Sequence, residues 1–246
     1  MRVLGLFAKE PIPGTCKTRL AKDIGDAAAI DFVEAGLQDL LKRCGSIGDL
    51  RILGYAPDSE AAKGYFEHRG SDLFRLWPQP PGNLDQRIEA FLSFALCSGM
   101  EVRTVLIGSD SPNLPATLIN DAFEALRERD VVLGPAADGG YYLIGVRRQV
   151  AGWLREVRWS TASTLRDTVA AATNAGLSLA VLSPWYDIDT ADDLQMLAGH
   201  LAAWRAADPA REFSRTERWL QRWIDSVEAA TAGGDQPSSG AAVESR

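Results

Sequence analysis

The sequence predicts an α/β fold built on a mixed, mainly parallel β-sheet. Short apolar runs alternate with longer amphipathic segments through about residue 198, which is the pattern of strands joined by crossover helices. Two of the runs, 129–136 and 140–146, are separated by too few residues for a crossover helix. One of these two strands is therefore expected to run antiparallel to the rest of the sheet.

Each strand and helix follows from its own segment of the sequence. The expected strands cover residues 2–8, 49–56, 72–78, 101–109, 129–136, 140–146 and 177–183. The expected helices cover residues 18–44, 83–98, 115–128, 161–175 and 190–206. In the segment 83–98 apolar side chains recur at helical spacing, so this helix is expected to bury one face in the core.

The chain is expected to form one main domain over residues 1–206, followed by an extension and a tail. Residues 207–230 place Trp219 and Trp223 on one face of a predicted helix, which docks either on the domain or on a second subunit. A homodimer is therefore one of the expected arrangements. Residues 231–246 have the Gly, Ser and Pro content of a disordered tail.

The composition limits the classes of function. Lys and Arg number 26 against 33 Asp and Glu, so broad binding to nucleic acid is not expected. No apolar run approaches the roughly 20 residues of a membrane span. The three cysteines lack CxxC spacing, which favours a reducing, cytoplasmic setting, and only His68 and His200 are present. Carboxylates, Lys, Arg and backbone amides must carry any chemistry.

The first candidate segment, LFAKEPIPGTCKTRL (residues 6–20), follows the first expected strand. It carries Lys9, Lys17 and Arg19 beside the start of a helix, where backbone amides point outward and favour a phosphate chain. Gly14 keeps the loop irregular, and Thr15 or Thr18 could cap the helix. The segment is not a Walker A loop, and a solvated basic loop is the alternative.

Acidic residues follow two later strands. Asp110 comes after Gly108 in GSDSPNLP (108–115), where it could hold Mg²⁺ or form an Asx turn. Asp187 and Asp189 alternate in WYDIDTADDL, so one of them is expected to face a ligand cleft while the other serves the next helix start with Thr190 and Asp192.

Two further segments could approach a ligand on the acceptor side. One contains Asp138, Gly139, Gly140 and Tyr141, where glycines allow close approach of the backbone or simply form a hairpin turn. The other, RWSTAST (158–164), contains Trp159 and Ser160, and its hydroxyl groups bind a ligand or cap a helix.

Five segments, LFAKEPIPGTCKTRL, GSDSPNLP, VLGPAADGGYYLIG, VRWSTAST and DIDTADDL, together resemble a bacterial family of GT-A-like proteins. These proteins are provisionally named glycosyltransferases and are often left as a domain of unknown function. The resemblance spans roughly residues 1–198. More distantly, the sequence resembles molybdenum-cofactor and 2-phospho-L-lactate guanylyltransferases. The resemblance implies a nucleotide-diphospho-sugar transferase fold. This fold is a three-layer α/β/α sandwich that binds the nucleotide at the carboxyl ends of its first strands.

The resemblance also implies roles for particular residues. Those implied to be catalytic are Asp110, Lys17 and Asp189. Asp110 and Asp189 would hold a divalent metal, Mg²⁺ or Mn²⁺, with Asp187 as the rival of Asp189. The nucleotide would contact Lys9, Gly14, Lys17, Thr18, Arg19, Gln79, Gly108 and Asp110. Gln79 lies in a segment that resembles the family pattern Q-x-x-G-D-L-G-x-R, with Asn83 and Asp85 at variant positions.

The leading hypothesis is a glycosyltransferase that uses a nucleotide-diphospho-sugar donor, a small-molecule acceptor and a divalent metal. The second hypothesis is a nucleotidyltransferase of the guanylyl or cytidylyl kind, which takes a nucleoside triphosphate and a phosphorylated small molecule. A third is a nucleotide-binding protein without catalysis, because Ser111 and Pro112 follow Asp110 where a D-x-D motif would have a second aspartate.

Overall fold

The computed structural model describes residues 1–70, 72–148, 151–210 and 214–233. Within these residues the chain forms seven strands and eight helices. The strands are β1 (Arg2–Lys9), β2 (Leu50–Ala56), β3 (Arg75–Pro78), β4 (Arg103–Gly108), β5 (Val131–Pro135), β6 (Tyr141–Val146) and β7 (Leu179–Val181). The helices are α1 (Thr18–Ile24), α2 (Asp26–Cys44), α3 (Glu60–Gly70), α4 (Leu84–Leu96), α5 (Ala116–Ala125), α6 (Thr164–Asn174), α7 (Ala191–Ala207) and α8 (Arg215–Gly233).

The strands form one mixed sheet in the order β3-β2-β1-β4-β6-β5-β7. Strand β1 pairs in parallel with β2 and β4, β2 with β3, and β5 with β7. Strand β6 is antiparallel to both of its neighbours, β4 and β5. The predicted fold class is confirmed, and β6 is the antiparallel strand that the short connection after residue 136 requires.

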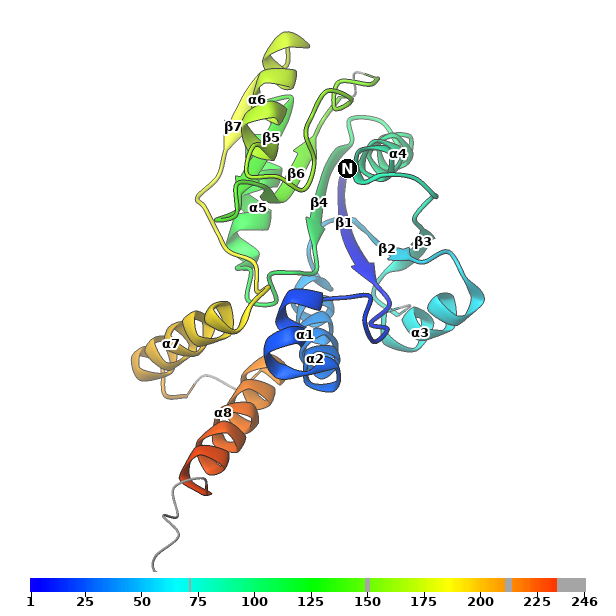
Figure 1. Ribbon diagram of the computed structural model, residues 1–246. Helices are drawn as coiled ribbons and strands as arrows, with labels where there is room; N and C mark the ends of the chain where they lie inside the picture. Colours follow the sequence, from blue (N-terminus) through cyan, green and yellow to red (C-terminus); the bar gives the residue numbers. More distant parts are fainter. Residues whose placement is uncertain (71, 149–150, 211–213, 234–246) are drawn as a thin grey trace, which may run out of the picture.

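Helices cover both faces of the sheet (Figure 1). On one face, Leu6 and Ile107 pack with buried side chains of α2, α3 and α5. On the other face, Leu106 and Ile144 pack with α4, α6 and the turns near residues 153–157. Buried apolar side chains alternate between the two faces along β4, as expected of a strand covered on both sides. The result is the three-layer α/β/α sandwich.

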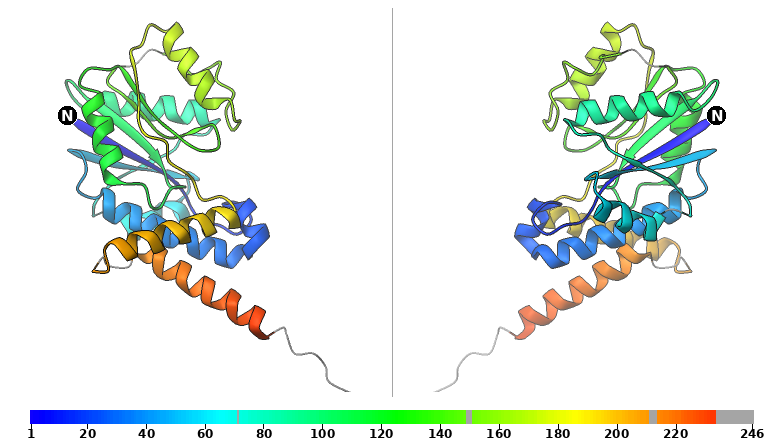
Figure 2. Two further views of the ribbon diagram at one scale, coloured as in Figure 1. Left: turned by 90° about the vertical axis from the view of Figure 1, so that its left-hand side faces the viewer. Right: turned by 90° about the vertical axis from the view of Figure 1, so that its right-hand side faces the viewer.

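A separate helical cluster lies at the end of the sheet toward which β1 points (Figure 1). Leu20 of α1, Phe32 of α2 and Leu194 of α7 pack there with Trp219 of α8 and with Ile188, which precedes α7. Helices α2 and α8 lie side by side in each view (Figure 2). This cluster therefore supports the two segments that carry Lys17 and Asp189.

Helix α8 is fastened to the domain by a buried carboxylate of α2. Asp39 accepts hydrogen bonds from the backbone N–H groups of Arg215 and Thr216, at 3.0 and 2.8 Å, and from the Thr216 hydroxyl at 2.6 Å. A carboxylate at a helix N-terminus satisfies amide groups that have no partner within the helix. Of the two dockings expected for this helix, the structure contains the one on its own domain.

Some expected boundaries differ from those observed. The expected helix 18–44 is two helices, because Gly25 between them has a φ of 87° that breaks the helical path. Helix α3 was not expected, since it buries few large side chains and so gives a weak apolar pattern. Neither Thr15 nor Thr18 caps α1, whose N-cap residue is Lys17. Of the expected tail 231–246, residues from 234 onward lie outside the described residues.

In the part of the chain that the structure describes, no helix combines the length and the apolar character needed to cross a bilayer.

Asp130, just before β5, ties this strand to the edge strand β7. Its carboxylate accepts from the backbone N–H and hydroxyl of Ser178, at 3.0 and 2.8 Å, and from Nε of Arg147 at 3.1 Å. Arg148 pairs with the same carboxylate at 3.0 Å. The hydrogen bond from Arg148 contributes most to a pKa of Asp130 well below its usual value, against the opposing effect of burial.

We expect Asp130→Asn to lower the free energy of unfolding at pH 7 by about 1 to 3 kcal/mol, because a neutral amide accepts weaker hydrogen bonds than the charged carboxylate. Because the folded-state pKa is depressed, the stabilisation is present above the unfolded-state pKa near 3.8 and is lost as the pH falls through the folded-state value. Urea unfolding of both proteins at pH 7, 5 and 3 measures this. The difference in free energy of unfolding between the parent and Asp130→Asn should be smaller at pH 3 than at pH 7. A difference that stays constant or grows toward pH 3 contradicts the role assigned to Asp130.

Candidate functional site

A cleft of about 770 Å³ opens at the carboxyl ends of β1 and β4. Twelve of the residues expected in the site line it: Lys9, Lys17, Arg19, Gln79, Gly108, Asp110, Asp138, Gly140, Tyr141, Trp159, Ser160 and Asp189. Gly14, Thr18 and Gly139 do not line it. The expected residues come from six separate parts of the chain, so their convergence in one cleft is a product of the fold.

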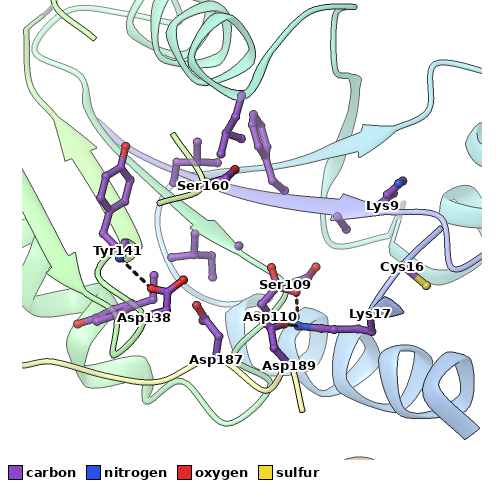
Figure 3. Close-up of a pocket in the computed structure, with 18 of the residues that line it drawn as sticks. Lys9, Cys16, Lys17, Ser109, Asp110, Asp138, Tyr141, Ser160, Asp187 and Asp189 are labelled. Atoms are coloured by element: carbon purple, nitrogen blue, oxygen red, sulfur yellow. Dashed lines mark hydrogen bonds and ion pairs between the residues drawn. The ribbon is translucent and has the colours of Figure 1, made fainter. Parts of the chain in front are cut away.

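The ammonium group of Lys17 joins the basic and acidic sides of the cleft (Figure 3). Its Nζ lies 2.5 Å from Oδ1 of Asp110 and 2.7 Å from Oδ1 of Asp189. The Lys17 side chain is only 7% exposed, whereas that of Asp110 is 56% exposed. Burial alone would lower the pKa of Lys17, but the two carboxylates outweigh it and raise that pKa. Lys17 is therefore a charged residue in this site.

The loop after β1 aims Lys17 at the carboxylates. Lys17 has φ 45° and ψ 42°, the left-handed region that residues with a side chain seldom adopt. Lys9 fixes the same loop, since its Nζ donates to the carbonyl oxygen of Thr15 at 2.8 Å. Arg19 is 70% exposed and its Nη1 lies 3.9 Å from Oδ2 of Asp189. Lys17 is thus tightly held, while Arg19 lines the cleft with most of its side chain exposed.

The segment after β7 runs beside the loop after β4. The backbone N–H of Ile188 donates to the carbonyl oxygen of Asp110 at 3.0 Å, and Oγ of Ser111 donates to Oδ1 of Asp187 at 2.5 Å. These two contacts place Asp187 and Asp189 next to Asp110. The expectation that only one of Asp187 and Asp189 faces the cleft is wrong, because both line it.

Asp187 and the helix that follows have well-defined partners. Withdrawal from water raises the pKa of Asp187 to about 6, although the Ser111 hydroxyl opposes the shift. Thr190 begins α7 as its N-cap, and its partner in the capping box is Asp193, where the sequence had suggested Asp192. Because Thr190 and Asp193 form the capping box, Asp187 takes no part in it.

The opposite wall is formed by two loops in close contact. Gly139 has φ 90°, and a Cβ at this position would lie 2.5 Å from the carbonyl oxygen of Ala162. The Gly139 carbonyl accepts from the backbone N–H of Leu165 at 2.9 Å. This contact holds the loop of Ser160 against the loop of Asp138, and both of these residues are exposed toward the cleft (Figure 3).

Capping in this region differs from the expectation. Helix α6 begins after Ser163, which is its N-cap residue, so Ser160 takes no part in capping. Thr161 instead accepts from the backbone N–H of Ser163 through its hydroxyl, at 3.2 Å. Ser160 has φ 56° and lines the cleft. Ser160 is exposed at this surface of the cleft.

Gln79, directly after β3, presents a fixed polar group to the cleft. It is 7% exposed, and its Nε2 donates to the carbonyl oxygen of Gly54 at 2.7 Å. Because a carbonyl can only accept, this bond fixes which end of the amide is nitrogen, and Oε1 and the second N–H remain for other partners. The site offers a hydrogen-bond acceptor at this point.

Several lining residues were not among the candidates from the sequence. Cys16, Ser109, Arg87 and Thr161 also line the cleft. Cys16, Ser109 and Thr161 lie inside candidate segments, and Arg87 lies in the segment that resembles Q-x-x-G-D-L-G-x-R, so these positions were the available signal. Arg87 lies in the first turns of α4, where its Nε donates to the carbonyl oxygen of Gly82 at 2.9 Å.

The donors in the cleft suit a hard divalent cation. Asp110 and Asp189 already place one oxygen each within 2.7 Å of a single positive centre, the ammonium of Lys17. Carboxylate oxygens are the ligands that Mg²⁺ prefers in proteins. Among the residues that the structure describes, no group of three or more His, Cys, Asp or Glu has the arrangement of a metal site. Asp110 and Asp189 are the two residues that could hold such a cation, at the place that the Lys17 ammonium occupies.

Comparisons with known proteins agree with this fold. Residues 47–161 match the family described as uncharacterized protein conserved in bacteria (DUF2064). Among curated protein sequences, none matches the chain. The resemblance seen in the sequence is thereby confirmed.

Solved structures share the whole fold. A protein from Desulfovibrio desulfuricans G20, provisionally named a nucleotide-diphospho-sugar transferase, has a TM-score of 0.83 and 28% identity, over 93% of this chain and 97% of that one. A nucleotidyl transferase from Methanothermobacter has a TM-score of 0.52 and 15% identity, over 83% and 99%. The 4-diphosphocytidyl-2C-methyl-D-erythritol synthase of Anaerococcus prevotii DSM 20548 has a TM-score of 0.53 and 13% identity, over 82% of this chain and 98% of that one. The last two show the fold alone.

We expect Gly139→Ala to destabilise the protein by about 1 to 3 kcal/mol, since Ala is strained at positive φ and its Cβ would strike the backbone of Ala162. Thermal unfolding followed by circular dichroism measures the effect. The matched control is Gly64→Ala within α3, where a Cβ meets nothing within 4 Å, and it should be neutral or slightly stabilising. Equal stability of the two variants would disprove the close contact.

Proposed function

We propose that the chain is a nucleotide-dependent transferase that moves a glycosyl group from a nucleotide-diphospho-sugar to a small-molecule acceptor, with a divalent metal. The observation that carries this proposal is the convergence of Lys17, Asp110 and Asp189 at the carboxyl ends of the strands. In open α/β sheets this edge is where ligands bind. A cation paired with carboxylates there suits the diphosphate part of a nucleotide and the metal that accompanies it.

The basic side of the cleft would bind the diphosphate. Lys17 supplies a charged donor and Arg19 a second, exposed one. Both stabilise negative charge better on a departing nucleoside diphosphate than on the intact donor, because the leaving group gains charge as the bond to the sugar breaks. A metal held by Asp110 and Asp189 would supply further neutralisation of that charge. Lys9 supports the site through the backbone of Thr15.

The remaining lining residues divide between base and acceptor. Gln79 offers a fixed acceptor oxygen, which suits an N–H group on the edge of a nucleobase. Ser160 and Asp138 face the cleft from the opposite wall, where they would hold the acceptor. Trp159 and Tyr141 pack edge to face at 6.1 Å between centroids and give this wall a rigid apolar part.

Nucleotidyl transfer is the second candidate. Four carboxylates line the cleft, those of Asp110, Asp138, Asp187 and Asp189, and this density of negative charge suits a nucleoside triphosphate bound with its cations. The name of the Desulfovibrio desulfuricans G20 protein, which shares 28% identity, supports glycosyl transfer as the first candidate. A nucleotide-binding role without catalysis predicts binding but no turnover with any donor.

Calorimetry in saturating Mg²⁺ tests the proposal with nucleoside diphosphates, nucleoside triphosphates and nucleotide sugars. The parent should prefer a nucleotide sugar over the matching triphosphate. Lys17→Ala should weaken that binding by about 1.5 to 3 kcal/mol, the contribution of a hydrogen bond to a charged group. The matched control is Lys22→Ala, an exposed lysine of the same helix, which should bind like the parent.

Two results would decide against parts of this account. A preference for the triphosphate would favour nucleotidyl transfer instead. Equal affinity of Lys17→Ala and the parent for every nucleotide would remove Lys17 from the phosphate site.

A further inference from the structure

The ammonium of Lys17 sits where a metal shared by Asp110 and Asp189 would have to sit. Its distances to the two carboxylate oxygens are 2.5 and 2.7 Å. Oxygen ligands lie at about 2.0 to 2.6 Å from Mg²⁺ or Ca²⁺ in proteins. Since the same two oxygens would have to approach the metal, the ion and the ammonium need nearly the same place. The two cations cannot occupy it together.

The position of Lys17 is set by the fold around it. Leu20, one turn further along α1, is fully buried in the helical cluster together with Ile188, which adjoins Asp189. Lys17 and Asp189 therefore belong to one packed unit. Asp110 comes from the end of β4 in the sheet, and the hydrogen bond from Ile188 to its carbonyl oxygen joins the two units. The ion pair thus joins the helical cluster to the end of the sheet.

The charges around Lys17 show that it cannot serve phosphate in this arrangement. One positive charge faces two carboxylates within 2.7 Å, and Asp187 lies close to both Asp110 and Lys17. The Lys17 ammonium is thus already engaged by two carboxylates and is not available to a phosphate. If a divalent ion took over the carboxylates, the charge of Lys17 would become available to an anion. Binding of metal and release of Lys17 are therefore linked.

We propose that Lys17 and a divalent cation compete for Asp110 and Asp189, so that the free protein holds itself in a state of low metal affinity. Displaced by the metal, the Lys17 ammonium turns toward the phosphates of the donor. This second step rests on the proposed function, whereas the competition does not. The site would accept metal and nucleotide as a pair more readily than either alone.

The test measures Mn²⁺ binding in the absence of any nucleotide, by electron paramagnetic resonance of free Mn²⁺. Lys17→Met keeps an unbranched side chain, one atom shorter than that of lysine, and removes its charge. We expect this variant to bind Mn²⁺ about tenfold or more tightly than the parent, because the metal no longer has to break two charge-assisted hydrogen bonds. The control Lys22→Met removes the same charge from an exposed position on α1 and should bind like the parent.

A second measurement uses the parent protein, in case Lys17→Met folds poorly. Acetylation of individual lysines by acetic anhydride, read by mass spectrometry, should increase at Lys17 when Mn²⁺ is added and stay constant at Lys22. Equal or weaker Mn²⁺ binding by a folded Lys17→Met, or acetylation of Lys17 that Mn²⁺ leaves unchanged, overturns the proposal. So does the absence of Mn²⁺ binding by both proteins. None of these results depends on nucleotide binding, which the calorimetry above tests separately.

Discussion

The pairing of Lys17 with Asp110 and Asp189 is the contact on which the cleft depends. It joins the loop after β1, the loop after β4 and the segment before α7, three parts of the chain that meet only at this edge of the sheet. Carboxylates brought this close repel one another unless a cation lies between them. The fold therefore requires a positive charge at this point, and both the proposed binding of nucleotide and the proposed competition with metal follow from that requirement.

The helical cluster at the end of the sheet gives this contact its rigidity. Phe32 of α2 lines the cleft on one side and packs against Trp219 of α8 on the other, with ring centroids 5.1 Å apart. Asp39 caps α8 from the next turns of α2. The C-terminal helix thus supports the wall of the cleft from behind, and its apolar residues Trp219 and Leu220 are buried within the same chain.

Local pattern predicted the elements of the sheet well, because each strand is a short apolar run with its own boundaries. Both the sequence pattern and the resemblance pointed to Lys17, Asp110 and Asp189, yet neither could show that these residues pair with one another. That contact depends on the left-handed backbone of Lys17 and on a partner 172 residues away. Alternation failed for Asp187 and Asp189, since their segment is not a regular strand and both side chains reach the cleft. Helix α3 was not predicted because it buries few side chains and its sequence therefore has little apolar periodicity.

The most direct test of the account is a crystal structure with Mn²⁺ and the nucleoside diphosphate that binds most tightly. Anomalous scattering locates the metal without reference to any assumed site. The account predicts Mn²⁺ between Asp110 and Asp189, with Nζ of Lys17 moved onto a phosphate oxygen. Lys17 still paired with both carboxylates, with Mn²⁺ and the diphosphate bound elsewhere, would contradict it.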